Sequence, residues 1–196
     1  MKRIYFSLFF ILVLTGVKAQ TDPALLVRLD SFMKVNHLLD FEKVMDFTYP
    51  KLFTIAPREQ MIELMQNTFE NEEMSSELDS LQTGKIWPEI KTDEGSFVKV
   101  DYTMVMRMKF KRDPADTTDE METLGMIAGL MEGQFGEGNV RIDSATKKII
   151  IKVNTALVAI KDSISPQWTF INFKKEEAMT SMLLSQDIID KLSAQQ

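Results

Sequence analysis

The feature that most constrains the fold of this chain is a run of alternating residues at positions 97–110. From position 102 to 110, the even positions hold a tyrosine, three methionines and a phenylalanine, whereas the odd positions include threonine, arginine and lysine. Side chains alternate between the two faces of a β-strand, so this pattern predicts a strand with one buried face and one face in solvent. The chain therefore has to build a sheet whose apolar face is covered by other elements.

Three helices are predicted before this strand. Asp22 suits the N-cap and Pro23 the first helical position, so the first helix is expected to begin there and to end near residues 36–37. A second helix is expected over residues 41–48, where Tyr-Pro ends it, and a third opens at Pro57. The apolar face of the third helix is predicted to consist of Met61, Ile62, Met65 and Phe69.

The rest of the chain is predicted to be mostly strands, with one inserted helix. Strands are expected at residues 74–82, 86–91, 140–142, 148–153, 156–160 and 168–173. Residues 112–138 are interpreted as an inserted acidic loop and helix, in which Thr117 and Glu120 form a capping box for a helix over residues 118–134. The glycines at every fourth position of that helix predict close packing on the sheet or on a second subunit. A last amphipathic helix is expected to bury Ile188, Ile189 and Leu192.

The first residues carry the pattern of a secretory signal peptide. Lys2 and Arg3 precede an apolar run at residues 4–14, and small residues follow it up to Ala19, where cleavage is expected. That run is too short to span a bilayer, which needs about 20 apolar residues. We therefore expect residues 1–19 to be a signal peptide and residues 20–196 to be a single α+β domain, exported to the periplasm or the extracellular space.

Charge and cysteine content exclude several classes of function. Cleavage would remove three basic residues and no acidic one, so the formal charge of −6 would become −9. Such a protein is a poor partner for nucleic acid or for an anionic membrane surface, and after cleavage no membrane span is expected. The chain has no cysteine, which excludes disulfides, thiolate chemistry and a lipoprotein anchor. An exported protein without disulfides or a glycosylation acceptor fits a bacterial source better than a eukaryotic one.

The order of these predicted elements resembles a known superfamily. Three stretches carry the resemblance: Asp-Phe-Glu-Lys-Val-Met-Asp-Phe-Thr-Tyr-Pro at residues 40–50, the alternating run at 100–109, and Gln-Trp-Thr-Phe-Ile-Asn-Phe at 167–173. Over about residues 22–175 the chain resembles small exported bacterial proteins of the nuclear-transport-factor-2-like superfamily, also called SnoaL-like or cystatin-like. The resemblance implies helices packed on a curved, mostly antiparallel sheet that forms a cone. The helix at 118–134 departs from the simplest members.

The superfamily does not select one function, because its members include isomerases, dehydratases, cyclases, ligand carriers and interaction modules. Enzymes of the steroid-isomerase type pair a tyrosine with a carboxylate in an apolar cone, where burial raises the carboxyl pKa. Tyr102 lies on the expected buried face, but its neighbour Asp101 lies on the other. His37 is the single histidine and falls near a helix end, where contact with the last carbonyls is the expected role.

The methionines of the alternating strand have two interpretations. Thioethers bind Cu(I), which an exported protein can meet. Met104, Met106 and Met108 share the face of Tyr102 and Phe110, however, and no His or Cys stands near them, so a deformable core or pocket wall is the better interpretation. No metal and no cofactor is expected.

The sequence therefore leads to one function and one alternative. We expect a non-enzymatic domain that binds a small apolar ligand or an envelope protein, with a second copy of the chain as a further candidate partner. The alternative is a lyase- or isomerase-type enzyme that uses a pocket tyrosine and a buried carboxylate. The residues expected to line the ligand site are Tyr49, Met65, Tyr102, Met104, Met106 and Trp168.

Overall fold

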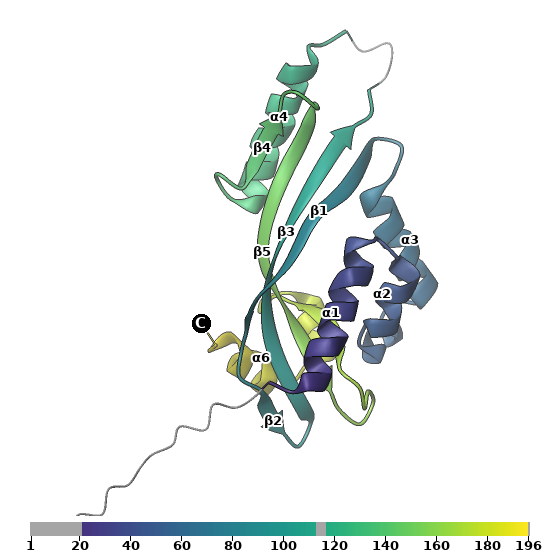
Figure 1. Cartoon of the computed structure of the whole chain (residues 1–196), viewed down its shortest axis with the longest axis vertical. Helices are drawn as coiled ribbons and strands as arrows, with labels where there is room; N and C mark the ends of the chain where they lie inside the picture. The colour runs from purple at the N-terminus through teal and green to yellow at the C-terminus, as the bar shows by residue number, and fades with distance from the viewer. Residues whose placement is uncertain (1–20, 113–116, 196) are drawn as a thin grey trace, which may run out of the picture.

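The computed structural model describes residues 21–112 and 117–195, so the predicted signal peptide and residues 113–116 of the predicted acidic loop lie outside the described residues. The described residues form an α+β fold, in which helices pack on a six-stranded antiparallel sheet (Figure 1). This confirms the predicted fold class. None of the helices in this part of the chain is both long and apolar enough to cross a membrane.

The predicted N-terminal helices are confirmed. The helical segments before the sheet are α1 (Pro23–His37), α2 (Phe41–Phe47), the short 3₁₀ helix η1 (Pro50–Thr54) and α3 (Arg58–Phe69). Asp22 caps α1 through a hydrogen bond from the backbone N–H of Ala24, and Asp40 caps α2 in the same way from Lys43. The predicted apolar face of the third helix packs with α1 and α2 in a small helical core, where Ile62 is buried and Met61, Met65 and Phe69 are half-buried.

Three long strands, β1 (Met74–Ile86), β3 (Gly95–Phe110) and β5 (Lys148–Lys161), form most of the sheet. The shorter strands are β2 (Ile90–Thr92), β4 (Val140–Asp143) and β6 (Thr169–Phe173). Their order is β1-β3-β5-β4, with β2 paired to β3 and β6 paired to β5. Because the edge strands β1 and β4 do not pair with each other, the sheet stays open and does not close into a barrel.

Two predicted strand breaks are wrong. The polar pair Asn154 and Thr155 separates two predicted strands, yet β5 runs through it without interruption. Both residues have cross-strand partners on β3, and the hydroxyl of Thr103 donates a hydrogen bond to Asn154 Oδ1 at 2.8 Å. Likewise β1 does not end at residue 82 but continues to Ile86. Its pairing with β3 shifts register twice, between Leu78 and Ser80 and between Thr83 and Ile86.

One face of β3 carries Val98, Val100, Tyr102 and the methionines, and two separate groups of helices cover it. α1 covers the end with Val98 and Val100, whereas α4 (Glu120–Phe135) covers the end with Met108 (Figure 1). Tyr102, Met104 and Met106, in the middle of β3, are only half-buried, and Tyr102 packs against the cluster that α1 covers. The prediction of a fully buried face is therefore wrong for these three side chains and correct for Met108.

The opposite face of the sheet is covered at one end by the C-terminal helices, α5 (Ala178–Leu183) and α6 (Gln186–Ser193). Phe97 of β3 belongs to the same apolar cluster as the side chains of α6. Ile188, Ile189 and Leu192 are buried there, which confirms the predicted amphipathic tail helix.

The inserted helix is confirmed as α4, but two details of its prediction are wrong. Asp119, and not Thr117, is its N-cap, since the Asp119 carboxylate accepts from the N–H groups of residues 121 and 122. A Cβ atom at Gly125, Gly129 or Gly133 would meet nothing within 4 Å. The glycine face is therefore open in the single chain, and it does not pack closely on the sheet; packing on a second subunit stays a prediction.

Candidate functional site

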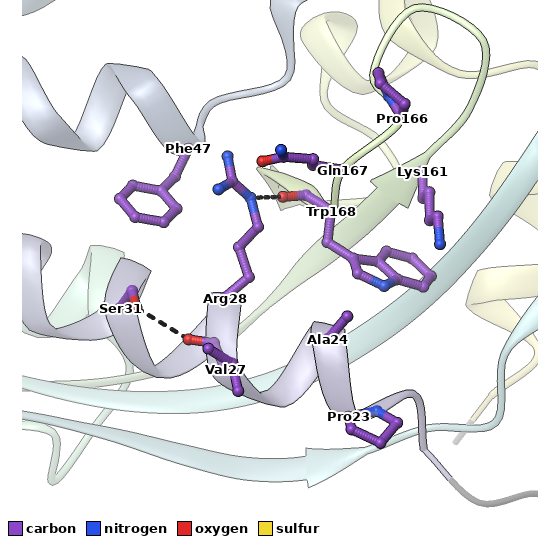
Figure 2. A pocket seen from close by; sticks show the side chains of 10 residues that line it. All are labelled: Pro23, Ala24, Val27, Arg28, Ser31, Phe47, Lys161, Pro166, Gln167 and Trp168. Carbon is purple, nitrogen blue, oxygen red and sulfur yellow. Dashed lines mark hydrogen bonds between the residues drawn. The ribbon is translucent and has the colours of Figure 1, made fainter.

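An apolar groove lies between α1, the end of α2 and the loop that joins β5 to β6 (Figure 2). Its volume is about 570 Å³, within the range of about 300–1,000 Å³ that is usual for sites of small ligands. Most of its wall is apolar, and Val27 is 70% exposed there. The apolar wall consists of Pro23, Ala24, Val27, Phe47, Pro166 and Trp168.

The helical period of α1 places one face on the sheet and the neighbouring face in the groove. Leu25 and Leu29 are buried in the cluster that includes Val98 and Val100, and they hold the helix against the sheet. Residues 24, 27, 28 and 31 are related by spacings of three or four (24 to 27 and 28, and both of these to 31), so they share the side of the helix that lines the groove.

Trp168 forms the opposite wall and is tied to the start of α1. Its side chain is 2% exposed, and its indole Nε1 donates a hydrogen bond to Asp22 Oδ2 at 2.9 Å. This bond, together with the bond from the N–H of Ala24, lowers the pKa of Asp22 below its usual value. One carboxylate thus caps α1 and fixes the indole that faces it.

The β5–β6 loop, which carries Pro166 and Trp168, is held by a buried tyrosine. The hydroxyl of Tyr49 donates a hydrogen bond of 2.5 Å to Asp162 Oδ2. Asp162 Oδ1 accepts from the N–H groups of Ile164 and Ser165 at 2.9 and 2.7 Å. Burial, and then the bond to Asp162, raises the pKa of Tyr49 well above its usual value. Both oxygens of this carboxylate are therefore used to shape the loop.

Arg28 supplies the positive charge on one side of the groove. Its Nε donates to the backbone carbonyl of Trp168, and its Nη2 donates to the carbonyl of Asp46 at 3.1 Å. The guanidinium carbon lies 4.7 Å from the ring centroid of Phe47, which is a cation–π distance. Figure 2 shows the guanidinium between Phe47 and Gln167. Burial lowers the pKa of Arg28, but an arginine keeps its charge in proteins.

Lys161 supplies a second positive charge, on the other side of Trp168 (Figure 2). Its Nζ lies 5.8 Å from the indole centroid and 3.9 Å from Asp22 Oδ2. The groove wall therefore has two cations and no carboxylate among its lining residues. Asp22 acts on Lys161 and Asp46 acts on Arg28 from outside the wall.

The structure does not bring the six predicted ligand residues together. Trp168 lines the groove. Tyr49 lies in the neighbouring core and Met65 in the helical core, and neither lines the groove. Met104 and Met106 follow Tyr102 in the middle of β3, where all three side chains are half-buried.

Tyr102 has an amide as its partner. Its hydroxyl donates a hydrogen bond of 3.0 Å to Asn172 Oδ1, and burial raises its pKa to about 12. Asp101 lies on the other side of the strand, as predicted, where it accepts from Trp87 Nε1 at 2.8 Å. The hydroxyl of Tyr102 is thus not paired with a carboxylate.

Sequence reasoning missed the groove's charged residues, Arg28 and Lys161, and its aromatic residue Phe47. Arg28 stands between Leu25 and Leu29, where a basic residue on an amphipathic helix is most often solvated. Its partner, the carbonyl of Trp168, is 140 residues away, so no local pattern could have revealed the contact. Searching the sequence for a basic residue between two apolar helix positions would have selected Arg28 as one of several residues, with nothing to distinguish it from the others.

In the part of the chain that the structure describes, no group of three or more His, Cys, Asp or Glu is placed to hold a metal ion. A scan of protein-family models finds no match to this chain, and neither the curated proteins nor the solved structures contain a significant match.

Proposed function

We propose that this protein is an exported, non-enzymatic binding protein that takes a small apolar molecule in the groove between α1 and the β5–β6 loop. The observation that carries the proposal is a groove of ligand size with an apolar wall. Its walls are already fixed by the Trp168–Asp22 and Tyr49–Asp162 hydrogen bonds. A site that is formed before the ligand arrives loses little entropy when it binds.

The alternative, a lyase or isomerase, has less support from the contacts. Acid–base chemistry needs a titratable pair with free hydrogen-bonding capacity near a pocket. The hydroxyl of Tyr102 is bound to an amide, and both oxygens of the Asp162 carboxylate already accept hydrogen bonds, from Tyr49 and from two backbone N–H groups. Neither tyrosine thus offers the pair that such an enzyme needs.

The two tryptophans provide a direct test of the binding proposal. In the ¹⁵N-labelled protein, each gives one indole N–H signal in a two-dimensional NMR spectrum. Trp168 lies in the groove wall, whereas Trp87 does not line the groove. Titration with the neutral probe 2-naphthamide and the anionic probe 2-naphthoate should shift the Trp168 signal saturably with at least one of them. The Trp87 signal should shift less, although the two tryptophans line one small cavity next to the groove.

A matched pair of variants locates the binding. Ala24→Phe puts a ring into the groove and should abolish the Trp168 shift, whereas Lys34→Phe adds the same ring at an exposed position of α1 outside the groove. If neither probe moves the Trp168 signal at millimolar concentration, or if the shift survives in Ala24→Phe, the proposed function is wrong.

A further inference from the structure

We infer that the molecule bound in this groove is an anion, with a flat apolar body and one carboxylate that Arg28 holds. This inference rests on the proposed function, because it names the chemical class of the ligand of that same groove.

The first argument is that Arg28 has no carboxylate partner at ion-pair distance. Among the described residues it forms no ion pair, and both of its hydrogen-bond acceptors are backbone carbonyls. The charge of Asp46 favours the charged form of Arg28 from beyond ion-pair distance, while Asp46 itself forms an ion pair of 2.8 Å with Arg58. A partly buried cation without a close counter-ion is costly, and an anionic ligand would reduce that cost.

The second argument is that Arg28 keeps free donors. A guanidinium has five N–H groups, and the described residues accept from Nε and from Nη2 but not from Nη1. The two bonds to carbonyls hold the planar group in place before a ligand arrives. A fixed guanidinium with free N–H groups suits a carboxylate, which can accept two of them at once.

Lys161 is a weaker candidate for the same role. Its ammonium already has Asp22 at 3.9 Å, and that carboxylate also holds the indole of Trp168. The two cations are therefore not equivalent: Lys161 has a carboxylate at ion-pair distance, and among the described residues Arg28 has none. This difference gives the test a matched pair of variants.

The apolar part of the ligand follows from the rings of the wall. Phe47 and Trp168 present aromatic rings on two sides of Arg28, and Pro23 and Pro166 add apolar rings at the ends (Figure 2). A planar molecule buries the most surface between such walls. A small inorganic anion would meet the guanidinium but leave the exposed apolar part of the wall, such as Val27, in water, so the groove is expected to prefer an aromatic carboxylate.

The test compares two probes of nearly the same shape, of which one is an anion with two acceptor oxygens and the other a neutral amide. 2-Naphthoate and 2-naphthamide have the same ring and almost the same shape, and their affinities come from the Trp168 indole shift. A charge-assisted hydrogen bond predicts a preference of about tenfold for the carboxylate in the unmodified protein. Acetate and inorganic phosphate should bind at least tenfold more weakly than 2-naphthoate, because they lack the ring.

Variants then assign the anion to one cation. Arg28→Gln should reduce the preference for the carboxylate to about onefold, Arg28→Lys should retain part of it, and Lys161→Gln should retain most of it. The circular-dichroism spectrum and the Trp87 indole signal show whether each variant is folded. If Arg28→Gln does not fold, the preference for 2-naphthoate over 2-naphthamide is compared in the unmodified protein and in Lys161→Gln. A preference that persists in Lys161→Gln assigns the carboxylate to Arg28, and one that is lost there assigns it to Lys161.

The outcomes separate the two proposals. Equal binding of the two naphthalene probes would overturn the anion inference and leave the proposed function intact, whereas no binding of either would overturn both. A preference that disappears in Lys161→Gln but survives in Arg28→Gln would show that Arg28 is not the anchor. Equal binding of acetate and 2-naphthoate would overturn the apolar body of the ligand.

Discussion

Leu25→Ala is expected to remove a large part of what holds α1 on the sheet. The side chain of Leu25 is 0% exposed and lies in the cluster with Val100 and Trp168. Replacing such a leucine with alanine loses the transfer free energy of the removed carbons and leaves a cavity. These two effects together cost about 2–5 kcal/mol of unfolding free energy. We expect a value in the middle of this range, about 3–4 kcal/mol, because side chains of β3 and β5 pack around Leu25 and limit how far the cavity can collapse.

The adjacent residue gives a matched control. Leu26 carries the same side chain one position later and is 43% exposed, so Leu26→Ala removes less buried surface and should cost less than about 1 kcal/mol. Urea unfolding followed by circular dichroism gives both values, provided that the slope of the free energy against urea is unchanged. Because α1 is one wall of the groove, Leu25→Ala should also weaken 2-naphthoate binding, and Leu26→Ala should not. Equal losses of stability in the two variants would refute this assignment of the buried face of α1.

Three further predictions concern the sheet, the tyrosines and the glycines. Met108→Asp should lower the free energy of unfolding by several kcal/mol, because Met108 is buried under α4. Met106→Asp should lower the free energy of unfolding clearly less, since Met106 is half-buried. Similar urea midpoints for these two variants would contradict this difference in burial between the two methionines. The pKa of Tyr102 is raised from 10.0 to about 12, so the stability that its protonated form contributes should be complete below pH 10 and be lost as the pH rises from about 10 to 12. Urea unfolding across this range should show the decrease, Tyr102→Phe should reduce it, and an unchanged pH dependence in that variant would contradict the assignment. Gly129→Ala should raise stability by about 0.4–1 kcal/mol, because the new Cβ meets open space in a helix. Gly95→Ala should lower it, since φ there is +146° and the Cβ would lie 2.8 Å from the carbonyl oxygen of Lys161; thermal unfolding of the two variants should therefore shift in opposite directions.

The sequence predicted most of the fold, because local patterns determine most of its elements. The caps at Asp22 and Asp40 and the strand at β3 depend on neighbouring residues alone, and these predictions are confirmed. The predicted division of β3 into a buried and a solvent face is not, because residues 101–107 are half-buried on both faces. The open edge between β1 and β4 was not predictable in this way, because it depends on which strands meet. Membership of the nuclear-transport-factor-2-like superfamily and export of the chain stay predictions.

The site was less predictable than the fold. Trp168 was selected from its place in an aromatic strand, and it does line the groove. Met104 and Met106 are only half-buried. Their burial depends on how far α1 and α4 extend along the sheet, and the residue pattern of a strand carries no information about that. Arg28 acquires its role only where α1, the end of α2 and the β5–β6 loop meet.

The measurement that tests the central claim most directly is a set of intermolecular nuclear Overhauser effects between bound 2-naphthoate and the protein. We predict contacts from the naphthalene protons to the methyl groups of Val27 and to the indole ring of Trp168, with the carboxylate end of the probe nearest to Arg28. Contacts to the methyl groups of Met104 and Met106 in their place would put the site at the middle of the sheet and contradict the account.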